Sequence, residues 1–124
     1  FGTQTAGLAA GGAPGQKSET EEYNGTSWTE VTNFNTARAQ LHGWGTQTAG
    51  AIVGGAEPSL SAKTEQYDGT SWTEGANLPA AKHNMGSVGT SSENALSITG
   101  YTTANVTTVE EWSQTLAAVT FTSS

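Results

Sequence analysis

Adjacent glutamates occur twice in the 124-residue sequence, as Glu21–Glu22 and Glu110–Glu111, and paired carboxylates are the groups that glycosidase or general acid–base chemistry requires. Both pairs lie in segments that read as β-strands. Because consecutive residues of a strand point to opposite faces of a sheet, the two carboxylates of a pair cannot share one substrate. Carboxylate catalysis is therefore not predicted.

The other reactive residue types also lack a catalytic spacing. Neither His42 nor His83 has a second histidine at metal-ligand spacing. The sequence has no cysteine, which excludes disulfides, thiolate metal centres and Cys-linked tyrosine chemistry. Serine and threonine are abundant, but no G-x-S-x-G motif is present. We expect no catalytic residue, no metal site, no cofactor and no enzymatic activity.

Charge and hydropathy exclude two further classes of function. The formal net charge is −7, and nucleic acids and anionic membrane surfaces are bound by clustered cations. No apolar run approaches the roughly 18 residues of a membrane span. We expect neither a nucleic-acid partner nor membrane insertion.

The sequence is an internal repeat. The segment TEEYNGTSWTE (20–30) returns as TEQYDGTSWTE (64–74), and GTQTAG (2–7) returns at 45–50. The repeat divides the chain into three units. These are residues 1–44, incomplete at the N-terminus, 45–88, and 89–124, a C-terminal capping variant.

The charged residues recur with the repeat. Glu21, Glu65 and Glu110 are equivalent, and Arg38 is equivalent to Lys82. A residue present in each copy is more economically structural than part of one asymmetric active site. We interpret these residues as ion pairs between strands or between units.

Each unit is predicted to contain four short strands, which places the chain in the all-β class. In the second unit they lie around residues 39–45, 49–55, 63–67 and 70–74. Asp68-Gly69, like Asn24-Gly25 before it, predicts a two-residue type I′ turn with φ above zero at both positions. No window has a helical period.

Repeats of 40–50 residues with four strands each are typical of β-propellers. One sheet of this composition cannot bury enough apolar surface alone, whereas small residues on both faces suit packing between copies. Propellers close with about four to eight blades. We therefore expect this chain's blades to be completed by further blades upstream or by oligomerisation, two copies giving six.

In the first two units, and partially in the third, a glycine doublet ends a strand and a tryptophan follows a tyrosine by five residues. This pattern resembles the kelch repeat. The wording GTQTA…GG…TEEYNGTSWTEV…NTAR further resembles Thr/Gly-rich kelch-like arrays of tail-fibre and other virion-associated proteins of marine bacteriophages. The resemblance implies a kelch-type β-propeller that acts as a non-enzymatic structural or adhesive module, located on a virion or outside the cell. The signature residues are Gly11, Gly12, Tyr23 and Trp28, then Gly54, Gly55, Tyr67 and Trp72, and in part Gly100 and Trp112.

The loop after the glycine doublet differs in each copy, at residues 13–19, 56–63 and 101–108. Loops on a rigid scaffold are where binding specificity is usually found. The expected partners are other copies of the chain, other virion proteins and host surface glycans. Two alternatives stay open, a carbohydrate-binding lectin-like propeller and a self-assembling filament or surface-layer protein. The candidate contact residues are Gln16, Lys17, Glu57, Lys63, Tyr101 and Asn105.

Overall fold

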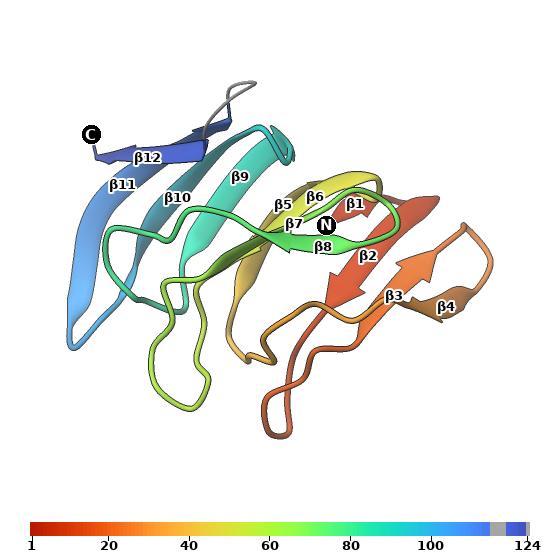
Figure 1. The fold of residues 1–124 in the computed structure, drawn as a ribbon, viewed down its shortest axis with the longest axis horizontal. Coiled ribbons are helices and arrows are strands. Elements are labelled where there is room, and N and C mark those ends of the chain that lie inside the picture. Colours follow the sequence, from red (N-terminus) through yellow and green to blue (C-terminus); the bar gives the residue numbers. More distant parts are fainter. Residues whose placement is uncertain (115–118, 124) are drawn as a thin grey trace.

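The computed structural model describes residues 1–114 and 119–123, which form three four-stranded antiparallel sheets. The predicted all-β class is confirmed, and these residues include no helix, so none that could cross a membrane. Figure 1 shows the three sheets side by side in chain order. Residues 115–118 and 124 of the predicted capping unit lie outside the described residues.

Each sheet is an up-and-down meander in which every strand pairs with the next along the chain. The repeat boundaries after residues 44 and 88 fall inside the first strands of the second and third sheets. The first sheet holds β1 (Gly2–Thr3), β2 (Ala6–Ala10), β3 (Thr20–Tyr23) and β4 (Trp28–Val31). The second holds β5 (His42–Thr46), β6 (Ala49–Val53), β7 (Thr64–Tyr67) and β8 (Trp72–Glu74). The third holds β9 (Gly86–Ser91), β10 (Asn94–Tyr101), β11 (Asn105–Gln114) and β12 (Val119–Ser123).

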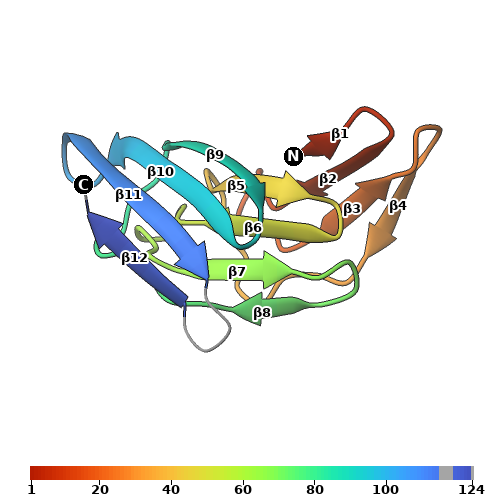
Figure 2. The ribbon, with the colours of Figure 1, turned by 90° about the horizontal axis from the view of Figure 1, so that it is seen from above.

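The sheets pack face against face, with their first strands along one side of the molecule and their fourth strands along the other (Figure 2). β5 packs against both β1 and β9. Alternation along β6 supplies both contacts, because Ile52 joins the buried cluster shared with the first sheet while Ala51 and Val53 join the cluster shared with the third. Burial of these apolar faces is what holds neighbouring sheets together.

The turns between the third and fourth strands differ from the predicted type. Each is a four-residue loop, Asn24–Ser27 or Asp68–Ser71, rather than a two-residue type I′ turn. Only the glycine has positive φ, 93° at Gly25 and 95° at Gly69. The side chain of the residue before each glycine, Asn24 or Asp68, explains the difference. Its oxygen accepts two backbone N–H groups of the loop at 2.8–2.9 Å, which fixes the turn without a second left-handed residue.

Acid is expected to weaken the protein partly through Asp68. The backbone N–H groups of Ser71 and Thr70 lower the pKa of its carboxyl group. A lowered folded-state pKa stabilises the fold above the unfolded-state pKa of about 3.9, and this contribution is lost as the pH falls through the folded value. Asn24 makes the same two bonds without a titrating group, so Asp68→Asn should keep the turn and remove this part of the acid dependence.

Thermal unfolding of the parent chain and of Asp68→Asn from pH 7 to pH 2 would measure this effect. The difference between their unfolding midpoint temperatures should stay constant above about pH 5 and change only below about pH 4. Parallel curves over the whole range would contradict the role given to Asp68.

The glycine doublets end the second strands of the first two sheets, as predicted, and both glycines of each doublet have positive φ. Gly54 has a φ of 65°, and a Cβ added there would lie 2.5 Å from the Lys82 carbonyl oxygen. In the third sheet the pair is Thr99–Gly100, and Thr99 has a φ of 58°. A β-branched residue is therefore held in a conformation that glycine occupies elsewhere in the chain.

Thr99→Gly is expected to stabilise the protein by roughly 1 kcal/mol. Left-handed backbone costs a non-glycine residue about 1–2 kcal/mol, and part of this gain is offset by the greater freedom of glycine in the unfolded chain. The Thr99 side chain is exposed, so its removal leaves no cavity. The matched control is exposed Thr73 in β8, where glycine should destabilise by roughly 1 kcal/mol. Urea unfolding measures the stability of both variants. Equal losses of stability for Thr99→Gly and Thr73→Gly would contradict backbone strain at Thr99.

Candidate functional site

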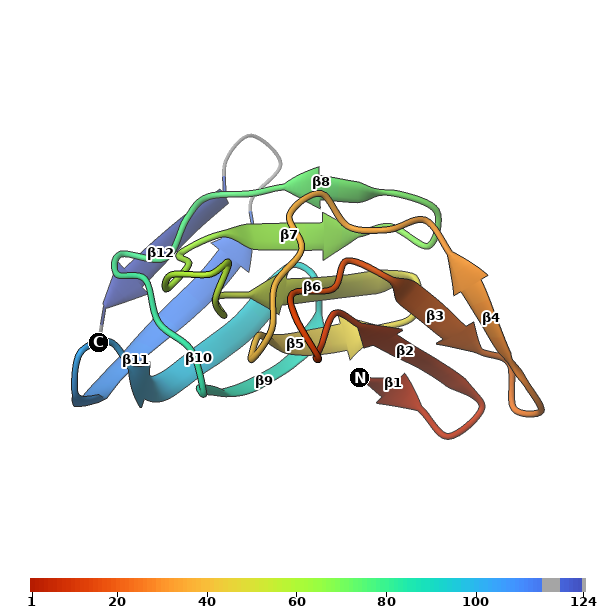
Figure 3. The same cartoon turned by 90° about the horizontal axis from the view of Figure 1, so that it is seen from below.

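The loops between second and third strands project from one edge of the molecule, the lower edge in Figure 1, and Figure 3 looks onto this edge. Four of the six predicted contact residues lie in these loops, and Tyr101 and Asn105 are the strand residues that flank the third loop. Gln16, Lys17, Tyr101 and Asn105 are exposed there, while Glu57 and Lys63 are half-buried. The linkers between sheets run along the same edge and pair with these loops at Lys17–Arg38 and His83–Tyr101. The loops are therefore fixed to the sheets rather than free-standing.

Two of the predicted contact residues contact each other. The Lys63 Nζ lies 3.4 Å from Glu57 Oε2 and 3.3 Å from the Thr36 hydroxyl, and Ser61 donates to Glu57 at 3.0 Å. This network joins the loop of the second sheet to the linker that precedes that sheet. Glu57 and Lys63 thus have a structural role that the sequence did not reveal.

The remaining candidates offer a more open surface. The Lys17 side chain makes a long, exposed ion pair with Glu19 at 3.7 Å. Tyr101 is 40% exposed and stacks on His83 with ring centroids 5.4 Å apart. Asn105 lies opposite Tyr101 in the β10–β11 ladder. The exposed polar and aromatic groups of this edge are thus spread over the first and third sheets.

The recurring charged residues form buried ion pairs between sheets. Arg38, in the linker after the first sheet, places its Nη2 3.1 Å from Glu65 Oε2 on β7, and both side chains are fully buried. The same carboxylate accepts the backbone N–H of Asn35 at 2.5 Å and that of Thr36 at 3.4 Å. Burial lowers the pKa of Arg38, and the Glu65 charge opposes that change. The Arg38 guanidinium also lies 5.6 Å from the centre of the Phe34 ring.

The second boundary repeats this arrangement with fewer donors. Lys82 Nζ lies 2.8 Å from Glu110 Oε2, with side chains 1% and 4% exposed. Pro79 occupies the position of Asn35 and has no N–H to give to the carboxylate. Of the two options left open by the sequence, the pairs join one sheet to the next, and they belong to the packing of the sheets.

The two adjacent glutamates of the first sheet point to opposite faces, as predicted. Glu22 accepts a 2.8 Å hydrogen bond from the Tyr67 hydroxyl of the second sheet, whereas Glu21 is exposed. Burial, followed by this bond to Glu22, raises the pKa of Tyr67 well above its usual value. Tyr67 is therefore a fixed hydrogen-bond donor and not a proton-transfer group near neutral pH.

One surface was not predicted from the sequence. The outward face of the first sheet, at the right-hand end in Figure 1, carries Glu21, Tyr23 and Trp28. Trp28 and Trp72 are equivalent in the repeat, but Trp72 is 7% exposed, whereas Trp28 is 53% exposed and its ring centroid lies 5.1 Å from that of Tyr23. The equivalence of Glu21 with Glu65 was the signal that could have identified this face.

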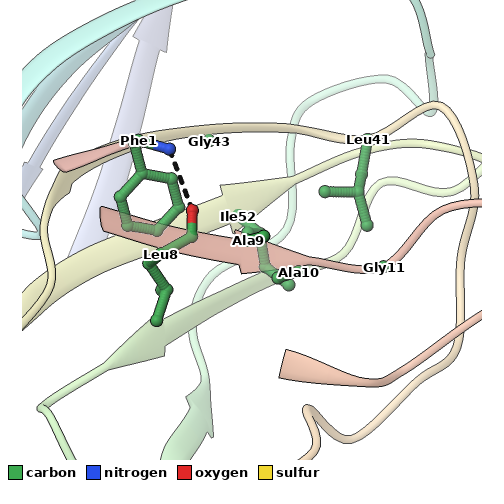
Figure 4. A pocket seen from close by; sticks show the side chains of 8 residues that line it. All are labelled: Phe1, Leu8, Ala9, Ala10, Gly11, Leu41, Gly43 and Ile52. Atoms are coloured by element: carbon green, nitrogen blue, oxygen red, sulfur yellow. Dashed lines mark hydrogen bonds between the residues drawn. The ribbon is translucent and has the colours of Figure 1, made fainter. Parts of the chain in front are cut away.

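A groove of about 380 Å³ opens between the first and second sheets (Figure 4). The Phe1 ring lies over Gly43 in it, and the terminal amino group donates to the Leu8 carbonyl at 3.0 Å. The lining side chains are apolar, so none of them could transfer a proton or bind an ion. It is lined by Phe1, Leu8, Ala9, Ala10, Gly11, Leu41, Gly43 and Ile52.

The two histidines lie apart, His42 on β5 and His83 in the linker before β9. Burial lowers the pKa of His42, and no set of three or more His, Asp or Glu residues that could hold a metal ion occurs in the described part of the chain. The described residues offer exposed surfaces for contact along the loop edge and on the outward face of the first sheet.

Comparison with known proteins shows a similarity of fold only. No protein-family model and no curated protein sequence matches the chain. The solved structure of YjhT superposes with a TM-score of 0.79 over 95% of the chain, at 15% sequence identity. The chain spans 42% of the length of YjhT, less than half of it.

Proposed function

We propose that the chain is a segment of a kelch-type β-propeller that acts as a rigid, non-enzymatic adhesive module. In this proposal each sheet is a blade, and the loops after the second strands contact a surface. The observation that supports it best is that three four-stranded sheets of the same topology hold loops of unlike sequence along one edge. Weak contacts made by several loops on one rigid body add through avidity.

The chemistry of the edge favours glycans as the surface contacted. Tyr101 offers an exposed aromatic face and a hydroxyl group, and Gln16 and Asn105 offer amide donors and acceptors. Aromatic rings and amides are the groups that make adaptable contacts with polar ligands. We further propose, on the resemblance of the repeat wording, that the module belongs to a phage virion.

Binding of the full chain to an array of bacterial surface polysaccharides tests the adhesive role. Tyr101→Ala and Asn105→Ala should each lower affinity about tenfold if these residues carry the contact. Asp68→Asn lies at the opposite end of the strands and should leave binding unchanged. Loss of binding in all three variants alike, or no binding of the parent chain to any glycan, would contradict the proposal. Mass spectrometry of purified virions tests the proposed location.

A further inference from the structure

Every boundary between sheets in this chain buries one acid from the third strand of the later sheet. Glu65 and Glu110 fill this position and are 0% and 3% exposed. Each meets a cation from the linker of the earlier sheet, Arg38 or Lys82. Glu21 is the equivalent acid of the first sheet, and it is exposed.

The aromatic residues beside the acid show the same difference. Trp72 packs edge-on against Phe34 at 5.8 Å and donates its Nε1–H to the Thr32 carbonyl at 3.1 Å, both in the linker of the earlier sheet. Trp28, its equivalent, has neither contact and is 53% exposed. The outward face of the first sheet therefore carries the same residue types that form an interface at the second sheet, and no described segment covers them.

We propose that this face docks a further blade whose closing segment has an apolar residue and, four positions later, an arginine or lysine. The pattern is that of Phe34–Arg38 and Leu78–Lys82, the two segments that cover the equivalent faces within the chain. The cation pairs with Glu21, and the apolar residue covers Trp28. This inference rests on the blade arrangement of the proposed function and adds the chemistry of the partner.

The charge distribution argues against a second copy of this chain as the occupant. A second copy would present its third sheet, whose outer face exposes Val88 and Leu96. The sequence after Lys82 contains no arginine or lysine. Glu21 would therefore be buried without a cation, which is strongly unfavourable. A blade that carries the cation avoids this cost.

An extended chain tests the proposal. Residues 42–87 are copied in front of Phe1, so that Phe1 continues the strand in the place of Val88 and the copied Lys82 faces Glu21. The copied unit also supplies β-strand partners for Ala9 and Ala10 at the edge of the groove in Figure 4. The extended chain should unfold at a higher temperature than the parent, and Trp28 emission should shift to shorter wavelength, with Trp28→Phe identifying that signal.

A charge exchange tests the contribution of the copied Lys82 charge opposite Glu21. Lys82→Glu in the copied unit alone should lower the folding equilibrium constant roughly 100-fold or more, because it places a second carboxylate against Glu21. Adding Glu21→Lys should restore most of that loss, and Lys82→Met in the copy serves as the uncharged control. Equal stability and equal Trp28 emission for the Lys, Met and Glu copies would overturn the proposal.

Two further results would also overturn it. One is a defined dimer of the parent chain that Glu21→Lys dissociates, because a second copy would then be the occupant. The other is glycan binding abolished by Trp28→Ala. The loop variants Tyr101→Ala and Asn105→Ala involve none of these residues, so the adhesive proposal and this one can fail separately.

Discussion

Replacing Arg38 by methionine should lower the free energy of unfolding by about 3–5 kcal/mol. The Glu65 carboxylate is fully buried, and the substitution removes its only cationic partner among the described residues, at 3.1 Å. The two backbone N–H groups that remain cannot replace a full positive charge in a low-dielectric interior. Urea unfolding followed by circular dichroism measures the loss.

The double variant Arg38→Met with Glu65→Gln is the matched control. Glutamine removes the charge and keeps a carbonyl oxygen for the Asn35 N–H, so most of the lost stability should return. This result would show that the unpaired charge, and not the lost volume of Arg38, caused the damage. A double variant no more stable than the single one would refute that explanation.

Trp44→Ala should be about as damaging, at about 3–5 kcal/mol. Trp44 on β5 is 2% exposed and packs with Trp112 at 6.3 Å, in the cluster that joins the second and third sheets. Its removal leaves a cavity where the first strands of two sheets meet. Hydrogen exchange should show the third sheet losing protection first, because this cluster attaches it to the rest of the chain.

Val88→Ala provides the control for that result. Val88 occupies the position of Trp44 one unit later but is 58% exposed, so its truncation should change stability by no more than about 0.5 kcal/mol. Similar losses for the two variants would mean that position within the unit matters and burial does not, contrary to the packing described here.

The repeat made much of the fold accessible from sequence. Because TEEYNGTSWTE and TEQYDGTSWTE have the same polar and apolar alternation, the strands of the second unit could be located to within about three residues. The opposite directions of Glu21 and Glu22 followed from the two-residue period of a strand. Local pattern was sufficient for both features.

What the sequence did not reveal depends on particular side-chain contacts and backbone conformations that the repeat pattern does not encode. The turn type at Asp68 was wrong because the side-chain oxygen binds the loop N–H groups. The left-handed Thr99 was not foreseen because threonine is a poor predictor of that conformation. Glu57 and Lys63 were selected as contact residues, yet they bind one another.

Of the two candidate surfaces, one was found from the sequence and the other was not. The variable loops could be found from differences between copies, and six of their residues were named in advance. The outward face with Glu21 and Trp28 was not singled out: the equivalence of Glu21 with Glu65 pointed to it, but a repeat makes equivalent residues look alike whether or not a neighbour covers them. Exposure, and not residue type, distinguishes Trp28 from Trp72.

The buried ion pairs give the repeat unit a direction, because its acid and its base lie at opposite interfaces. In the second unit, Glu65 pairs with the cation of the preceding unit, and Lys82 pairs with the acid of the following unit. Whole units can thus be duplicated, deleted or exchanged in a gene while each internal junction keeps one positive and one negative group. Such an array can change its length and its loops by recombination without evolving any new interface.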